Sequence, residues 1–121
     1  MRPHENLDVW KRAVDFTVKI YTCTEAFPKD ERFGLTSQIR RASVSISANI
    51  AEGAARKSSK EFLNFLSIAQ GSTSEISTEL LIAFRLGFIT DAVYLVMSNE
   101  LDEIGRMITG LCNHLKTKMR A

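Results

Sequence analysis

Few residues in this chain have the types and spacing that catalysis or metal binding requires. Neither His4 nor His114 has a glutamate three residues before it, so the Glu-x-x-His pairs that hold two metal ions in helical bundles are absent. Glu75 and Glu79 stand four residues apart, which fits an exposed acidic edge, or partners for arginines of another subunit, better than a catalytic pair. We therefore predict no catalytic residue, no metal site and no cofactor, and the chain is not expected to be an enzyme.

The cysteines and glycines give no further sign of a reaction. Cys23 and Cys112 are far apart and form no C-x-x-C motif, so we expect free thiols packed among apolar side chains rather than a disulfide. Gly105 and Gly110 fall within an apolar heptad pattern, which predicts close helix packing rather than a phosphate-binding loop.

The remaining candidate for a binding site is basic. Residues 29–60 carry seven Lys or Arg against three Asp or Glu, whereas residues 61–104 carry one against seven. The candidate contacts for nucleic-acid phosphates are Arg40, Arg41, Arg56, Lys57 and Lys60. Such a group can bind a polyanion, face solvent, or pair with acidic residues of another subunit. Few aromatic residues interleave with it, so stacking on bases is not predicted.

A second basic group closes the chain, at Lys116, Lys118 and Arg120. Cations at this position complement the negative end of a helix macrodipole. Their expected role is helix capping and solubility.

Four segments have the periodicity of amphipathic helices, at about 8–27, 35–53, 59–86 and 91–117. Pro28 is expected to end the first and Gly53 the second. Ser58 with Glu61 three residues later forms a capping box at the start of the third, and Thr90 is a natural N-cap for the fourth. The predicted fold is an all-α, antiparallel up-and-down four-helix bundle that forms one domain over the whole chain.

The predicted helices carry more apolar surface than one bundle core needs. The first has two apolar stripes, one from Leu7 to Tyr21 and one from Val9 to Cys23, and the outer face of the second is lined by small residues. A monomer would leave this surface in water, so we expect a homo-oligomer. The candidate interface residues are Val9, Phe16, Ile20, Arg40, Arg41, Val44, Ala48 and Glu52.

Length and composition are those of an ordinary globular domain. The chain has 121 residues, of which 45% are apolar and 25% charged. No stretch approaches the roughly 20 apolar residues that span a bilayer, and the first residues lack the apolar segment of a signal peptide. The expected location is the cytoplasm, without a membrane partner.

The central part of the sequence resembles a known family. Residues 33–76 read FGLTSQIRRASVSISANIAEGAARKSSKEFLNFLSIAQGSTSEI, and LDVWKRAVDFTVKIYTCTEAFP precedes them. This pattern is similar to the four-helix-bundle proteins encoded in intervening sequences of bacterial 23S ribosomal RNA genes, and it covers roughly residues 7–89. The resemblance implies a ring-shaped homopentamer. It also implies a fold shared with the accessory protein of diversity-generating retroelements, which binds nucleic acid and a reverse transcriptase. The family has no established activity, and Arg40, Arg41, Glu52 and Arg56 lie within the matching motif.

Two functions remain as hypotheses. In the first, the protein is a non-catalytic oligomer whose basic residues form a ring that contacts RNA or DNA phosphates. In the second, it is an oligomeric scaffold for a protein partner, such as a nucleic-acid-processing protein, and Arg40 and Arg41 stabilise subunit interfaces by pairing with carboxylates.

Overall fold

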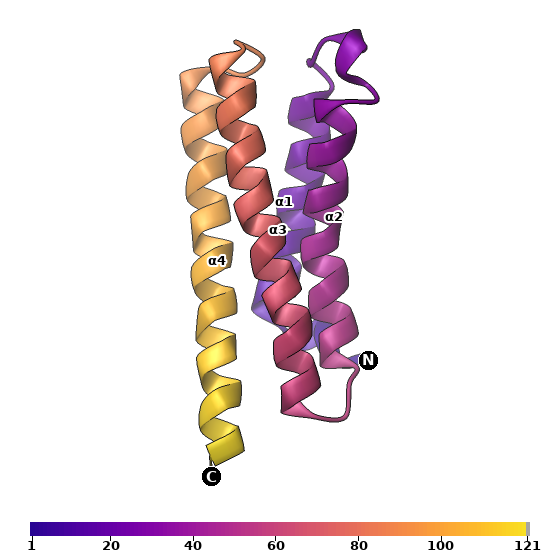
Figure 1. Cartoon of the computed structure of the whole chain (residues 1–121), viewed down its shortest axis with the longest axis vertical. Coiled ribbons are helices and arrows are strands. Elements are labelled where there is room, and N and C mark those ends of the chain that lie inside the picture. The colour runs from indigo at the N-terminus through magenta and orange to yellow at the C-terminus, as the bar shows by residue number, and fades with distance from the viewer. Residues whose placement is uncertain (121) are drawn as a thin grey trace.

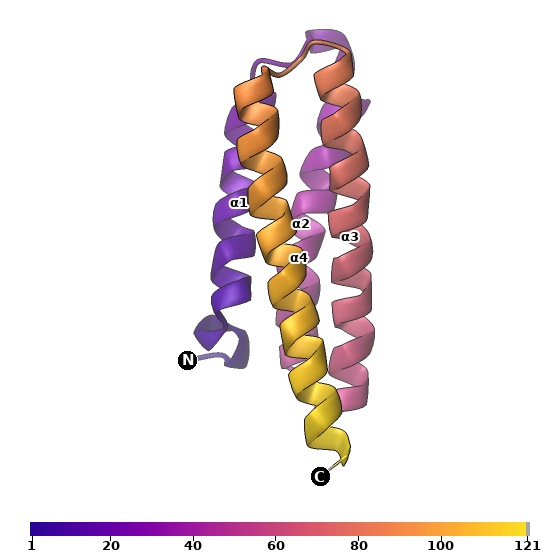
Figure 2. The same ribbon diagram turned by 90° about the vertical axis from the view of Figure 1, so that its left-hand side faces the viewer.

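Four long helices run alternately up and down the long axis of the molecule (Figures 1 and 2). In the computed structural model, which describes residues 1–120, they are α1 (Asp8–Thr24), α2 (Leu35–Ala54), α3 (Ser59–Arg85) and α4 (Asp91–Arg120). Short 3-10 turns precede α1 and α2, at Pro3–Asn6 and Lys29–Glu31. The predicted all-α up-and-down bundle is confirmed. Both chain ends lie at the same end of the molecule as the α2–α3 connection (Figure 1).

The core is built from one buried stripe of each helix. The stripes predicted for α2, α3 and α4 are confirmed, because apolar side chains at steps of three and four residues meet along the bundle axis. Their fully buried members are Ile39, Ile46, Ile50, Leu66, Ile76, Leu80, Ile104 and Ile108.

Helix α1 uses the other of its two apolar stripes. Val9, Phe16 and Ile20 lie in the core of the chain itself, and Phe16 is only 1% exposed. Val18 and Tyr21 point outward instead, with Val18 61% exposed. The expectation that Val9, Phe16 and Ile20 form a subunit interface is therefore wrong, because their side chains are already covered by α1's neighbours in the same chain.

Two predicted helix caps are present. Ser58 Oγ accepts a hydrogen bond from the Glu61 backbone N–H at 3.2 Å, and Thr90 Oγ1 accepts one from the Val93 N–H at 3.2 Å. Helix α1 ends at Thr24, before the expected residue 27, and the chain then turns, with the Glu25 N–H donating to the Thr22 carbonyl at 3.3 Å and the Phe27 N–H to the Thr24 carbonyl at 3.1 Å.

Gly53 lies within α2 rather than after it, and its role is packing. A Cβ atom at this position would lie 2.7 Å from Phe62 Cδ1 and 2.9 Å from Phe65 Cβ. Glycine therefore allows α2 and α3 to approach closely where they diverge into their connection. The turn after α3 instead uses Gly87, whose φ of 77° favours glycine.

The apolar end of α3 is covered mainly by aromatic side chains. The Phe84 ring stacks on Tyr94 with centroids 4.7 Å apart, and Phe88 packs on Phe27 at 5.4 Å. Ile82 and Leu86 remain exposed. Within residues 1–120, no helix is long and apolar enough to cross a membrane.

Candidate nucleic-acid interface

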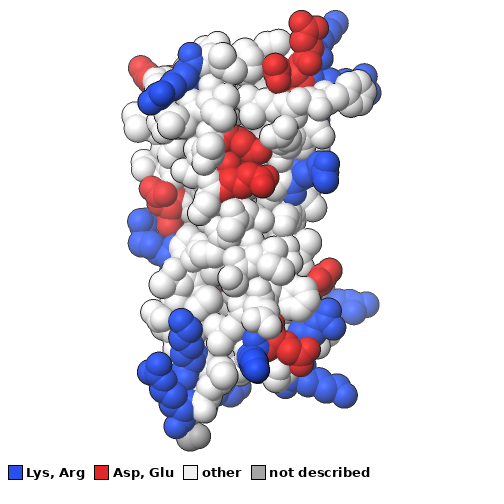
Figure 3. Space-filling view, in the orientation of Figure 1, with Lys and Arg blue, Asp and Glu red and all other residues white. Residues whose placement is uncertain are grey.

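One end of the bundle gathers basic side chains from segments that are distant in the sequence. The α2–α3 connection contributes Arg56 and Lys57, and the first turn of α3 contributes Lys60, all of them exposed. The last turns of α4 reach the same end and contribute Lys116, Lys118 and Arg120 (Figures 1 and 3). We call these six residues the basic end. The two groups are more than fifty positions apart in the sequence. They lie at the same end of the bundle because α3 and α4 run antiparallel.

The charge of this end is uneven. Residues 1–8, 52–61 and 113–120 together hold seven Lys or Arg against four Asp or Glu. The opposite end, comprising residues 25–33 and 85–91, holds three against four. Among residues 1–120, the ion pairs are Lys19–Glu100 and Arg106–Glu103, and neither involves the basic end. Its cations are therefore available to an external polyanion.

Arg56, a member of the basic end, contacts an aromatic ring. Its guanidinium carbon lies 4.8 Å from the centroid of the Phe65 ring, within the range of a cation–π contact. This contact positions the planar guanidinium over the α3 surface without using its hydrogen-bond donors. All five donors remain open to phosphate oxygens.

Arg40 is engaged within its own chain. Its Nε donates to Thr24 Oγ1 at 2.8 Å and its Nη2 to the Tyr21 carbonyl at 3.2 Å, while the guanidinium carbon lies 4.6 Å from the Tyr21 ring centroid. The last carbonyls of a helix lack intrahelical partners, so Arg40 caps α1 from the neighbouring helix. These contacts favour a structural capping role for Arg40 over the phosphate and subunit contacts that the sequence suggested.

Arg41 is exposed but lies far from the basic end. Helix α2 continues for thirteen residues from Arg41 to Ala54, about 20 Å along the axis at 1.5 Å per residue, and Arg56 lies beyond that end. The five candidates thus do not form one patch. Val44, Ala48 and Glu52 are exposed on α2 between these two arginines, so their surface is open to another subunit.

Arg41 borders an open groove between α2 and α3, which we call the Glu79 groove. Its volume is about 640 Å³, and it is lined by Gln38, Arg41, Ala42, Ser45, Ser72, Glu75, Thr78, Glu79 and Ile82. Glu79 is only 4% exposed, and its Oε1 has no hydrogen-bond partner. Burial, with a contribution from the Glu75 charge, raises the pKa of Glu79 to about 7. The predicted exposed acidic edge is therefore correct for Glu75 and wrong for Glu79.

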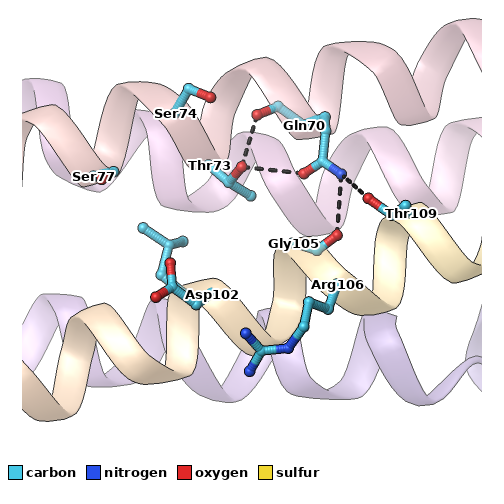
Figure 4. Close-up of a pocket in the computed structure, with 9 residues that line it drawn as sticks. Gln70, Thr73, Ser74, Ser77, Asp102, Gly105, Arg106 and Thr109 are labelled. Atoms are coloured by element: carbon cyan, nitrogen blue, oxygen red, sulfur yellow. Dashed lines mark hydrogen bonds between the residues drawn. The ribbon is translucent and has the colours of Figure 1, made fainter.

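A second groove, of about 570 Å³, runs between α3 and α4 (Figure 4). Gln70 bridges the two helices, because its Nε2 donates to the Gly105 carbonyl at 3.0 Å and to Thr109 Oγ1 at 2.9 Å. A Cβ atom at Gly105 would lie 3.6 Å from Gln70 Oε1, an ordinary contact, and one at Gly110 would meet no described atom within 4 Å, so neither position shows the close helix packing that the heptad pattern predicted. Arg106 pairs with Glu103 at 2.9 Å. The groove's principal polar groups therefore already have partners, which favours a structural role.

The two cysteines are free and half-buried, as predicted. Burial raises the pKa of both thiols, which lowers the thiolate fraction and hence their reactivity. Within the described part of the chain, no group of three or more His, Cys, Asp or Glu could hold a metal ion.

Comparisons with known proteins identify a family and a similar fold. A protein-family model described as 23S rRNA-intervening sequence protein matches residues 5–110, and so includes most of α4, which the resemblance in sequence did not cover. A crystal structure of a protein of unknown function from the S23 ribosomal protein family of Bacteroides thetaiotaomicron is 28% identical, with a TM-score of 0.78. That match covers 86% of this chain and 97% of the other. No curated protein matches the chain.

Proposed function

Because this chain belongs to the family of 23S rRNA-intervening sequence proteins, we propose that it is a non-catalytic oligomer that binds RNA or DNA through phosphate contacts at its basic end. The observation that carries the proposal is the convergence of Arg56, Lys57 and Lys60 with the basic C-terminal turns of α4. These cations have no ion-pair partners within residues 1–120.

Phosphate binding suits this geometry better than base recognition. Exposed Lys and Arg side chains that neutralise phosphates release condensed counterions, and this gain does not depend on base sequence. The basic end consists of lysines and arginines, and the aromatic ring that contacts one of them, Phe65, lies beneath Arg56. It therefore offers cations for phosphates rather than aromatic rings on which bases could stack. The expected binding is therefore salt-sensitive and weakly selective for sequence.

Oligomerisation multiplies this charge. The face formed by α2 and α3 exposes Val44, Ile68 and Ile82 at 43%, 53% and 43%, beside Ala48. Figure 3 shows a group of acidic side chains in the upper centre of this view and a largely uncharged area below it. We take the α2–α3 face as the subunit contact surface, with Arg41, Glu52 and the exposed Glu75 among its charged members. In a homopentameric ring with parallel bundle axes, five basic ends would lie on one face.

The scaffold hypothesis also has an observation in its favour. An apolar groove of about 500 Å³ lies between α1 and α4 and is lined by Val18, Cys23, Val93, Val96 and Met97, among others. Val18 and Val96 are 61% and 56% exposed. An apolar segment of a nucleic-acid-processing protein would fit there, and this function does not require phosphate binding.

Two variants of equal charge change separate these functions. Arg56→Ala combined with Lys57→Ala removes two cations from the basic end, whereas Lys29→Ala combined with Arg32→Ala removes two from the opposite end. Fluorescence anisotropy with labelled mixed-sequence RNA and duplex DNA measures affinity. We expect at least a tenfold loss in the first variant and less than twofold in the second.

Equal losses in the two variants would indicate a response to net charge alone and would contradict a site at the basic end. Absence of binding by the unaltered protein at physiological salt would reject the nucleic-acid function and leave the scaffold function.

A further inference from the structure

The Glu79 groove contains a carboxylate whose surroundings are incomplete. Glu79 is buried at 4% exposure, yet neither a hydrogen bond nor an ion pair to its carboxylate is present among residues 1–120, and Oε1 is shielded from water. Buried carboxylates are normally hydrogen-bonded or paired with a cation, because leaving water without a partner costs several kcal/mol. A group absent from the single chain would complete this site.

The lining of the groove indicates the chemistry of that group. Ser72 and Thr78 bring hydroxyl oxygens, and Gln38 brings an amide oxygen, all of which can accept hydrogen bonds. Ser45 Oγ already accepts from Asn49 Nδ2 at 2.9 Å and from Ser72 Oγ at 3.0 Å. Glu75 adds a second carboxylate one helical turn from Glu79. Ala42 and Ile82 supply apolar walls that an alkyl chain can contact. A cation with several N–H donors and a short aliphatic stem fits all of these features.

We propose that the Glu79 groove binds a guanidinium or primary ammonium group, which pairs with the Glu79 carboxylate and donates hydrogen bonds to the surrounding acceptors. A planar guanidinium can donate to both carboxylate oxygens at once. Two sources supply this group: a small free organic cation, and the arginine side chain of a second copy of the chain.

Arg41 is the one basic residue that lines the groove, and it does not occupy the site. It makes no ion pair within 4.0 Å with any carboxylate among residues 1–120, although it borders the same groove. Its exposed position at the rim leaves the deeper Glu79 carboxylate to another cation.

The groove is independent of the proposed nucleic-acid contact. Glu79 lies nineteen residues along α3 from Lys60, about 28 Å at 1.5 Å per residue. The charged groups facing the groove are Glu75 and Glu79 from α3 and Arg41 from α2. A bound cation stabilises ionised Glu79, so affinity should rise with pH through the titration of this carboxyl near pH 7.

The test is carboxyl ¹³C NMR of Glu79 during titration with agmatine, which carries a guanidinium and an ammonium on a four-carbon chain. We expect a saturable shift of the Glu79 signal at pH 8 and at least a tenfold weaker affinity at pH 5.5. Neutral 1,4-butanediol should leave the signal unchanged. Asp102→Asn, which alters a carboxylate of the α3–α4 groove, should keep agmatine affinity within twofold, whereas Glu79→Gln, followed by calorimetry, should abolish it.

The mass of the protein during the same titration distinguishes the two sources. A fall in mass by light scattering as agmatine is added would identify the occupant as an arginine of a second copy, and an unchanged mass would identify a free cation. Either result supports the site.

Three results would overturn it: no saturable shift at pH 8, equal agmatine binding by the Glu79→Gln variant, or a rise in the pKa of Glu79 on replacing Arg41 with Ala. The last would show that Arg41 already neutralises the carboxylate. None of these results bears on RNA binding at the basic end.

Discussion

Adjacent arginines of α2 have different surroundings. Arg40 donates to Thr24 and Tyr21 of α1, whereas Arg41 is exposed and borders the Glu79 groove. The sequence could not distinguish them, since both stand in the same motif and differ only in the helix face that they occupy. The partners of Arg40 lie sixteen and nineteen residues earlier, and only the packing of α1 against α2 brings them within reach.

Replacing Arg40 with Ala should therefore destabilise the chain. The change removes two charge-assisted hydrogen bonds and a contact with the Tyr21 ring, and the expected loss is about 1–2 kcal/mol in the free energy of unfolding. Arg41→Ala is the matched control, with an expected change within about 0.5 kcal/mol. Urea denaturation followed by circular dichroism measures both, and equal losses would contradict the capping role of Arg40.

Glu79 should make stability depend on pH. Its pKa of about 7 in the folded chain exceeds the ordinary value of 4.5, so the folded state binds the proton more tightly than the unfolded state. The resulting stabilisation is fully present below pH 4.5 and is lost as pH rises through 7. Glu79→Gln lacks this titration, so at pH 8 it should be more stable than the unaltered protein by about 1–3 kcal/mol, from 1.36 kcal/mol per pKa unit.

Thermal unfolding of the Glu79→Gln variant at pH 5 and pH 8 measures this effect. The difference from the unaltered protein should be present at pH 8 and small at pH 5. A difference of the same size at both pH values would show that Glu79 acts through packing rather than through its charge.

At the scale of the helices, sequence periodicity predicted most of the architecture. The inward stripes of α2, α3 and α4 and the caps at Ser58 and Thr90 follow from local rules that need no knowledge of the neighbours. Helix α1 is the exception, because two apolar stripes satisfy the same periodicity. Packing against α2 and α4 selects the stripe of Phe16 and leaves Val18 exposed.

The close approach of α2 and α3 gives a test at the same scale. Gly53→Ala would normally stabilise a helix by about 0.5–1 kcal/mol. Here the added methyl would lie under 3 Å from atoms of Phe62 and Phe65, so we expect a net loss of about 1–3 kcal/mol. Gly71→Ala is the control within α3, where the new Cβ has no neighbour within 4 Å, and it should show the normal gain.

Differential scanning calorimetry compares the two glycine variants. A higher Tm for both would contradict the tight helix contact at Gly53. A lower Tm for both would instead mean that Gly71 has a packing role of its own, which its exposed position does not indicate.

At the scale of the whole molecule, apolar surface on the α2–α3 face predicts self-association. Multi-angle light scattering at micromolar concentration should give a multiple of the 13.6 kDa chain mass, five-fold for the proposed ring. Ile82→Asp should lower that mass without unfolding the chain, because it would bury an unpaired charge in the contact. Leu95→Asp on α4 is the control, since Leu95 is 59% exposed on another helix.

A mass of one chain for the unaltered protein would reject self-association. A dimer or tetramer would reject the ring alone, and equal dissociation by Ile82→Asp and Leu95→Asp would move the contact away from the α2–α3 face.

The two basic segments meet only in the folded molecule. The sequence therefore predicted phosphate contacts for Arg56, Lys57 and Lys60 but not for the C-terminal cations. The sequence indicates only helix capping for the C-terminal cations, because their proximity to residues 56–60 depends on the antiparallel course of α3 and α4. Sequence proximity groups Arg41 with Arg56, Lys57 and Lys60, yet about 20 Å of helix lies between Arg41 and the end of α2, and Arg56 follows that end.

The salt dependence of nucleic-acid binding tests the central claim most directly. For mixed-sequence duplex DNA, the logarithm of the affinity should fall linearly with the logarithm of salt concentration, with a slope near −0.9 per phosphate contacted. Arg56→Ala combined with Lys57→Ala should weaken binding about equally for all sequences and make the slope shallower, while the oligomer mass stays constant. Undiminished, salt-resistant binding by this variant would contradict phosphate recognition at the basic end.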